Sequence, residues 1–126
     1  MKTLTVHASE TYDILIGENI LASALARFAG SGRFCLVTDS NVEPLYGDLV
    51  RGLLKAHGSV SGFTFPAGEP SKTLGTFSLL LEHLASAGLT RSDTVVALGG
   101  GVTGDLAGFA ASCYLRGVRV LQIPTT

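Results

Sequence analysis

The chain has 126 residues, of which 46% are hydrophobic and 15% are charged, and its formal net charge is −1. This composition is typical of one globular domain with a buried core and excludes a disordered chain. Because there is no basic cluster, the charge balance argues against binding to nucleic acid or to a membrane surface. No apolar run approaches the roughly 18 to 20 residues that span a membrane.

The N-terminus and the cysteines predict a cytoplasmic protein. Residues 1–6 lack the long apolar region of a secretory signal. Cys35 and Cys113 each lie in an apolar segment, which favours two reduced, buried thiols over a disulfide.

The first thirty residues predict a hairpin followed by a helix. Residues 3–8 and 11–16 alternate between apolar and polar on either side of Ser9 and Glu10, as in an antiparallel hairpin. Residues 19–29 have the spacing of an amphipathic helix, which the glycine at position 30 is expected to end.

From residue 33 onward, strand and helix patterns alternate. Strands are expected at residues 34–37, 60–65, 94–98 and 118–123. Three helices are expected between them. Their buried faces are expected to contain Leu45, Leu49 and Leu53 in the first helix, Leu74, Phe77, Leu81 and Leu84 in the second, and Val102, Leu106, Phe109 and Cys113 in the third. Gly58, Gly88 and Gly117 are expected to end the first, second and third helix. Apolar strands that alternate with helices predict an α/β fold: a Rossmann-like parallel sheet with helices on both faces and the hairpin at its N-terminus.

Four segments follow these strands, and ligands of parallel sheets bind at the carboxyl ends of strands. The segments are residues 39–41, 68–72, 99–105 and 124–126. The chain stops on a loop directly after a buried strand, with no helix to cover it. We therefore expect residues 1–126 to be the N-terminal domain of a larger protein.

Three consecutive glycines, Gly99 to Gly101, lie between an apolar strand and a helix pattern. With Gly104 they match the Gly-x-Gly-x-x-Gly dinucleotide fingerprint. The match fails two further tests, since it is not in the first strand–helix unit and no acidic residue follows some 20 positions later. Tight packing alone would explain a glycine here, but three in a row before a helix favour a phosphate-binding turn.

The polar residues beside these loops each allow two interpretations. Asp39 and Asn41 precede a helix and could simply cap it, or they could hold the hydroxyls of a ribose. Asp105 lies in the first turn of the helix after the glycines, where the helix dipole favours a carboxylate with or without a cofactor.

Two basic residues, Lys72 and Arg116, also allow two interpretations each. Ser71 is expected to cap the next helix, which would put Lys72 in its first turn beside Glu69, where the dipole disfavours a cation. That conflict points mildly to a ligand, although a surface lysine can tolerate the position. Arg116 could serve only the dipole at its helix end, or it could bind an anion.

No catalytic nucleophile or metal site is visible. The three histidines are scattered, and no pair of cysteines or histidines has the spacing of a zinc site. The chain also lacks a Gly-x-Ser-x-Gly elbow, so it gives no support to nucleophilic catalysis.

Residues 99–126 (GGGVTGDLAGFAASCYLRGVRVLQIPTT) closely resemble the 3-dehydroquinate synthase family. Residues 68–72 (GEPSK) and 38–41 (TDSN) match further motifs of that family. The resemblance covers the whole chain, but only the N-terminal, NAD-binding domain of the family. The glycine run alone would also suit polyol and iron-dependent alcohol dehydrogenases, or a free-standing nucleotide-binding module.

The resemblance implies a site for NAD. Its residues would be Asp39, Asn41, Glu69, Lys72, Gly100, Gly101, Val102, Asp105, Thr125 and Thr126. It also implies that Arg116 binds the phosphate of a sugar-acid substrate across the interface of a homodimer.

Family members are carbon–oxygen lyases of the shikimate pathway, which leads to chorismate and the aromatic amino acids. They convert 3-deoxy-D-arabino-heptulosonate 7-phosphate to 3-dehydroquinate and phosphate by transient oxidation, phosphate elimination, reduction and aldol cyclisation. A divalent metal, zinc or cobalt, assists this reaction. The family's metal ligands lie in a C-terminal helical domain beyond residue 126, so the resemblance implies that this chain alone is inactive.

Overall fold

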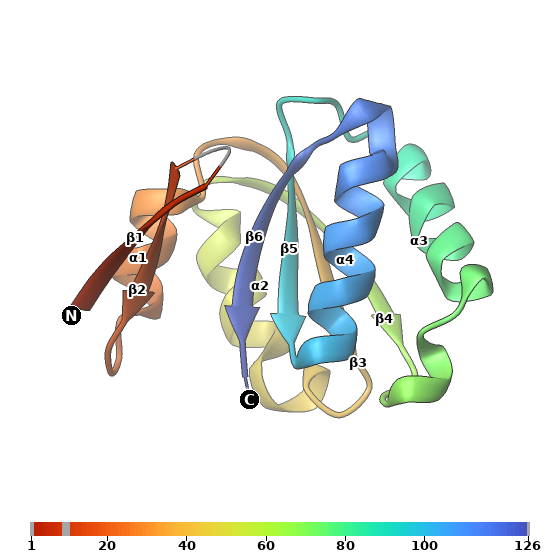
Figure 1. The fold of residues 1–126 in the computed structure, drawn as a ribbon, viewed down its shortest axis with the longest axis horizontal. Helices are drawn as coiled ribbons and strands as arrows, with labels where there is room; N and C mark the ends of the chain where they lie inside the picture. Colours follow the sequence, from red (N-terminus) through yellow and green to blue (C-terminus); the bar gives the residue numbers. More distant parts are fainter. Residues whose placement is uncertain (1, 9–10, 126) are drawn as a thin grey trace. The chain divides into compact units, whose positions relative to one another are not determined.

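A computed structural model describes residues 2–8 and 11–125 (Figure 1). The chain divides into two compact units, residues 1–30 and residues 31–126.

The first unit is a hairpin with one helix. Strands β1 (Lys2–His7) and β2 (Thr11–Ile16) pair antiparallel, and α1 (Leu21–Phe28) follows. The carboxylate of Asp13 in β2 accepts a hydrogen bond from Thr5 in β1 at 2.8 Å and one from Arg27 in α1 at 2.6 Å. The expected hairpin and helix are confirmed, whereas the expected turn at positions 9 and 10 lies outside the described residues.

The second unit is built on a parallel sheet. Its strands are β3 (Gly32–Asp39), β4 (Gly58–Phe65), β5 (Thr94–Gly99) and β6 (Arg119–Pro124), in the order β4-β3-β5-β6. Every residue of β5 is buried, as the continuous apolar pattern predicts. The chain runs from β3 to β4 on one side and then crosses to β5 on the other side of β3. The switch point of the sheet, where ligands of such folds bind, is therefore between β3 and β5.

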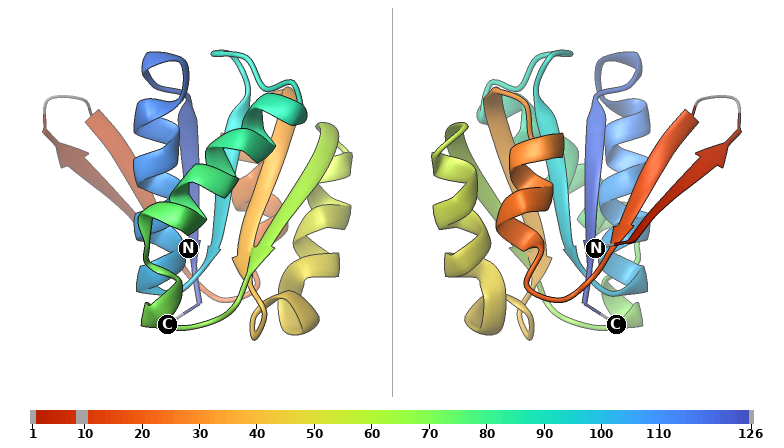
Figure 2. Two further views of the ribbon diagram at one scale, coloured as in Figure 1. Left: turned by 90° about the vertical axis from the view of Figure 1, so that its right-hand side faces the viewer. Right: turned by 90° about the vertical axis from the view of Figure 1, so that its left-hand side faces the viewer.

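Helices cover both faces of this sheet (Figure 2). A π-helical turn (Glu43–Gly47) leads into α2 (Asp48–Lys55) on one face. Helices α3 (Leu74–Ser86) and α4 (Gly101–Cys113) lie side by side on the other face. They share one core cluster with β3 and β5, and the predicted Rossmann-like architecture is confirmed.

The expected buried face of α2 is wrong. Leu45 is 71% exposed, Leu49 is also exposed and Leu53 is only half-buried, whereas Val50 and Leu54 are fully buried. The π-helical turn holds more residues than an α-helical turn, so it rotates the following side chains around the helix axis. Gly58, expected to end this helix, is instead the first residue of β4.

The expected face of α4 is wrong in part. Leu106 is buried, but Phe109 and Cys113 are exposed, and most of the buried positions are small residues such as Ala107 and Ala110. Small side chains let the helix lie close to the sheet. The spacing of large apolar residues does not indicate which small residues are buried.

Two further expectations are corrected. Leu74, the first residue of α3, is 79% exposed, whereas Leu84 in the same helix is buried as expected. Both cysteines are free, as expected, but only Cys35 is buried and Cys113 is exposed.

Candidate functional site

The carboxyl ends of the four parallel strands lie at one edge of the sheet. Asp39 and Gly99 directly follow Thr38 and Leu98, which are partners in the register of β3 and β5. They are therefore neighbours at the switch point of the sheet.

The glycine turn between β5 and α4 is held close to its own helix. A Cβ atom added to Gly99 would lie 2.5 Å from Oγ1 of Thr103, and that threonine is 1% exposed. Any side chain at position 99 would therefore push the turn and the helix apart. This contact explains the first glycine of the run by packing rather than by a ligand.

The second and third glycines are different. Gly100 is the extended N-cap of α4, and among the described residues no side chain caps this helix start. The first N–H groups of a helix have no partner within the helix, so they are available to an anion. A Cβ atom added to Gly101 would meet none of the described atoms within 4 Å. The turn thus presents backbone donors to open space.

The loop after β6 touches this turn. The backbone N–H of Thr125 donates to the carbonyl of Gly99 at 3.0 Å, which places Thr125 beside the glycines. Thr126, the other threonine of the predicted site, lies outside the described residues.

Asp39 caps the turn after β3. Its Oδ1 atom accepts the backbone N–H groups of Asn41 at 2.9 Å and of Val42 at 2.8 Å. Among the described residues its Oδ2 atom has no such partner and can accept a hydrogen bond from a ligand. Both interpretations of this aspartate are thus compatible with its geometry.

A serine that the sequence reasoning missed ties two of the loops together. Ser40 donates its backbone N–H to the carbonyl of Phe65 at 2.9 Å, and its hydroxyl accepts the N–H of Ala67 at 2.9 Å. The loops after β3 and β4 therefore hold each other in place. No pattern in the sequence indicates these contacts, because Phe65 and Ala67 are 25 and 27 positions away from Ser40.

The loop after β4 differs from the prediction. Ser71 lies in a 3₁₀ turn (Glu69–Ser71), and its hydroxyl donates to the carbonyl of Pro66. Thr73 caps α3 instead, by accepting the N–H of Thr76 at 3.2 Å. Lys72 therefore precedes the cap and is not in the first turn of the helix, so the predicted conflict with the helix dipole does not occur.

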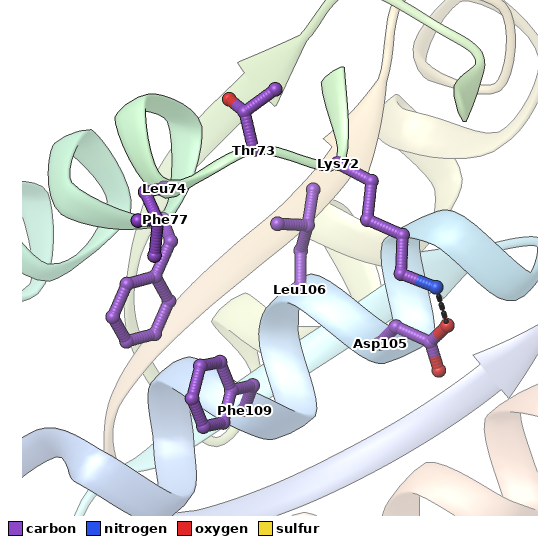
Figure 3. Close-up of a pocket in the computed structure, with 7 residues that line it drawn as sticks. All are labelled: Lys72, Thr73, Leu74, Phe77, Asp105, Leu106 and Phe109. Carbon is purple, nitrogen blue, oxygen red and sulfur yellow. Dashed lines mark hydrogen bonds and ion pairs between the residues drawn. The ribbon is translucent and has the colours of Figure 1, made fainter. Parts of the chain in front are cut away.

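Lys72 pairs with Asp105 (Figure 3). The Nζ atom of the lysine lies 2.8 Å from Oδ2 of the aspartate. The hydrogen bond and the charge of Asp105, followed by the charge of Glu69, raise the pKa of Lys72. Asp105 is the fifth residue of α4 and lies in its second turn, so its predicted place in the first turn is corrected.

This ion pair borders a cavity of about 420 Å³ between the start of α3 and the first half of α4. The lining residues are Lys72, Thr73, Leu74, Phe77, Asp105, Leu106 and Phe109. The rings of Phe77 and Phe109 stack with their centroids 4.7 Å apart. The cavity therefore has a charged end next to the glycine turn and an apolar end along the two helices.

Arg116 is the one described candidate that the structure does not bring to this edge. It follows α4 in a short 3₁₀ turn (Tyr114–Arg116) and is exposed. The thirteen residues of α4 separate it from the glycine turn, a rise of about 18 Å. Leu115 and Arg116 have φ angles of 48° and 66°, which non-glycine residues rarely adopt.

Residues 2–8 and 11–125 contain neither a group of metal ligands nor a helix that could span a membrane. In these ranges no three His, Cys, Asp or Glu side chains are grouped so that they could hold a metal ion. No described helix combines the length and apolar character needed to cross a membrane.

Comparisons with known proteins give a consistent result. The family model described as 3-dehydroquinate synthase N-terminal matches residues 62–126. The chain is 43% identical over 127 residues to the 3-dehydroquinate synthase of Alkaliphilus metalliredigens, covering 100% of this chain and 35% of that protein. It is 50% identical over 119 residues to that of Streptococcus sanguinis, covering 91% of this chain and 34% of that protein. The chain therefore spans about a third of the length of the curated relatives it matches.

Solved structures agree. A 2-deoxy-scyllo-inosose synthase complexed with carbaglucose-6-phosphate, NAD⁺ and Co²⁺ matches with a TM-score of 0.92 and 29% identity, over 99% of this chain and 35% of that one. The 2-epi-5-epi-valiolone synthase of Streptomyces hygroscopicus, with NAD⁺ and Zn²⁺ bound, matches with a TM-score of 0.81 and 30% identity, over 98% and 35%. A glycerol dehydrogenase from Schizosaccharomyces pombe, at 17% identity, a TM-score of 0.67 and 84% and 25% coverage, shares the fold alone.

Proposed function

The chain belongs to the 3-dehydroquinate synthase N-terminal family, and we propose that it forms the NAD-binding part of a 3-dehydroquinate synthase. The observation that carries the proposal is the uncapped start of α4 at the switch point of the sheet, where Gly101 faces open space. A pyrophosphate fits such a helix start because it accepts hydrogen bonds from several N–H groups at once.

The neighbouring residues fit the rest of a dinucleotide. Asp39 has one carboxylate oxygen available beside the glycine turn, where it can accept hydrogen bonds from ribose hydroxyls, and Asn41 follows it in the same loop. Glu69 and Lys72 come from the loop after β4, and Thr125 comes from the loop after β6. We assign NAD binding to these residues together with Gly100, Gly101, Val102, Asp105 and Thr126.

The proposed reaction of the whole enzyme is the conversion of 3-deoxy-D-arabino-heptulosonate 7-phosphate to 3-dehydroquinate and phosphate, in the cytoplasm. When bound, NAD⁺ supplies a hydride acceptor for an alcohol of the substrate and later returns the hydride. The residues of this chain hold the cofactor and orient it at the edge of the sheet. We place the ligands of a zinc or cobalt ion outside this chain, as the resemblance to the family implies.

Arg116 has a separate role in the proposal. It lies at the far end of α4 from the glycine turn, so it is poorly placed to serve a site on its own subunit. In a homodimer its exposed guanidinium can bind the substrate phosphate in the site of the partner subunit.

The test is a calorimetric titration with NAD⁺. It uses a protein of the same length as the curated relatives. One molecule of NAD⁺ is expected to bind per subunit, and the same preparation is expected to release phosphate from the seven-carbon substrate. Failure to bind NAD⁺ would reject the proposed function.

A further inference from the structure

We propose that Lys72 supports NAD⁺ binding by neutralising Asp105, rather than by contacting the pyrophosphate itself, and that the two residues act as one unit. This inference rests on the proposed NAD site and specifies how two of its residues divide their work. Lys72 is in this sense a positioning and neutralising residue.

The two side chains come from different segments of the chain. Lys72 precedes α3, Asp105 lies in α4, and their charged atoms are 2.8 Å apart. In Figure 3 the lysine extends along the rim of the cavity to reach the carboxylate. The other charge that acts on this ammonium group among the described residues is Glu69, which is also acidic. The lysine is therefore engaged by carboxylates before any ligand arrives.

Asp105 is placed where it would oppose an anionic ligand. It lies four residues after Gly101, which is about 6 Å along the helix axis. A carboxylate this near the start of the helix opposes the binding of a phosphate there, because like charges repel. A lysine at hydrogen-bond distance removes most of that repulsion, because the pair then has no net charge.

Direct contact of Lys72 with the pyrophosphate is the competing explanation. An ammonium group has three donors, so a bond to Asp105 does not by itself prevent a second bond. The two explanations differ in what happens when the carboxylate is removed. A neutralising lysine becomes dispensable in a variant without the carboxylate, whereas a lysine that contacts phosphate remains necessary.

A double-mutant cycle separates them in the full-length protein. The variants are Lys72→Met, Asp105→Asn and the double variant, and the Kd of NAD⁺ is measured for each by calorimetry. Lys72→Met alone is expected to raise Kd about tenfold. In the Asp105→Asn background the same substitution is expected to change Kd by less than about twofold. Lys72→Arg keeps the charge and is expected to restore binding to within about threefold of wild type.

Arg51 provides the control, because its guanidinium also pairs with carboxylates, those of Glu43 at 2.8 Å and Asp48 at 2.9 Å, away from the candidate site. Arg51→Met is expected to leave Kd unchanged. Melting temperatures of the Lys72 and Asp105 variants should match wild type, since both side chains are about half exposed. The KM for NAD⁺ should rise in Lys72→Met with little change in kcat.

Equal losses from Lys72→Met in both backgrounds would overturn the inference and leave the proposed function standing. Absence of NAD⁺ binding by the wild-type protein would reject the proposed function and this inference with it.

Discussion

The backbone N–H of Thr125 donates a hydrogen bond to the carbonyl of Gly99, with 3.0 Å between nitrogen and oxygen. The bond joins the loop after the last strand to the glycine turn. Similar contacts join the other loops, since Ser40 bonds to the loop after β4 and Lys72 bonds across to α4. The edge of the sheet is therefore held together before a cofactor binds, which reduces the ordering cost of binding.

Substitution of Gly101 by alanine tests whether a ligand approaches the glycine turn. The added methyl group meets none of the described atoms, so the fold should tolerate it, and α4 should not be destabilised. If the pyrophosphate lies against this residue, the methyl group will displace it. We expect Kd for NAD⁺ to rise about tenfold, measured by calorimetry, with an unchanged melting temperature.

Gly52 supplies the control for that substitution, because a Cβ atom there also meets nothing within 4 Å among the described residues. It lies inside α2, so Gly52→Ala should stabilise the protein by about 0.5 to 1 kcal/mol and leave Kd unchanged. A Gly101→Ala variant that binds NAD⁺ as tightly as wild type would place the cofactor elsewhere.

The sequence predicted the sheet well because each strand is a short apolar run bounded by turn residues, and β5 is buried over its whole length. It also predicted that the carboxyl ends of these strands come together, since parallel strands bring them to one edge of the sheet. Helix faces were predicted less well. The π-helical turn before α2 and the alanines of α4 alter which residues are buried. Neither feature is visible in the spacing of the large apolar residues along the sequence.

Contacts between distant parts of the chain could not be predicted. Lys72 and Asp105 are 33 positions apart, and only the packing of α3 against α4 brings them together. The distance of Arg116 from the glycine turn, in contrast, follows directly from the length of the helix between them. Helix geometry is local and can be read from sequence, whereas the pairing of loops requires the whole fold.

Asp93 should make stability depend on acid pH. It is 4% exposed and accepts hydrogen bonds from the backbone N–H groups of Arg33 and Thr90, at 2.8 and 2.7 Å, and from the Thr90 hydroxyl. Burial raises the pKa of Asp93, but these hydrogen bonds and the charge of Arg33 together lower it below its usual value. The ionised form is therefore favoured in the folded protein.

This carboxylate contributes stability above its unfolded pKa of about 3.9, and the contribution is lost as pH falls through the lower folded pKa. We expect Asp93→Asn to lower the free energy of unfolding by about 1 to 3 kcal/mol at pH 7. The deficit should shrink below pH 4. Asp48, whose side chain is fully exposed, is the control, and Asp48→Asn should have little effect at either pH. Equal deficits for the two variants would contradict this assignment.

The buried thiol of Cys35 should be unreactive in the folded protein. Burial raises the pKa of Cys35 to about 11, against a smaller opposing effect of a hydrogen bond with Ser61. At pH 8 its thiolate fraction, and hence its alkylation rate, should be about 100-fold below that of an ordinary cysteine. Peptide mass mapping after iodoacetamide treatment measures this rate, and the urea-unfolded protein is the reference. Rapid modification of Cys35 in the native protein would show that β3 opens readily.

Arg116 should act in the partner subunit's site, and mixing of variants can test this. In the full-length enzyme assayed at limiting NAD⁺, Arg116→Ala and Gly101→Ala should each lose most activity, the first through phosphate binding and the second through NAD⁺ binding. If Arg116 serves its own subunit, each site of a mixed dimer of these two variants carries one substitution, so the mixed dimer has no intact site.

In the arrangement we propose, one site of the mixed dimer carries both substitutions and the other carries neither, so unfolding and refolding the two variants together should give mixed dimers with about half of the wild-type activity. The double variant Arg116→Ala/Gly101→Ala mixed with wild type provides the complement. Its mixed dimers should then contain one site that lacks Arg116 and one that lacks the glycine, and their activity should fall below half of wild type. Mixed dimers of the two single variants that recover no activity would contradict the proposed sharing, because that outcome is expected only if each Arg116 serves its own subunit. Tagged subunits allow the mixed dimers to be purified before phosphate release is measured.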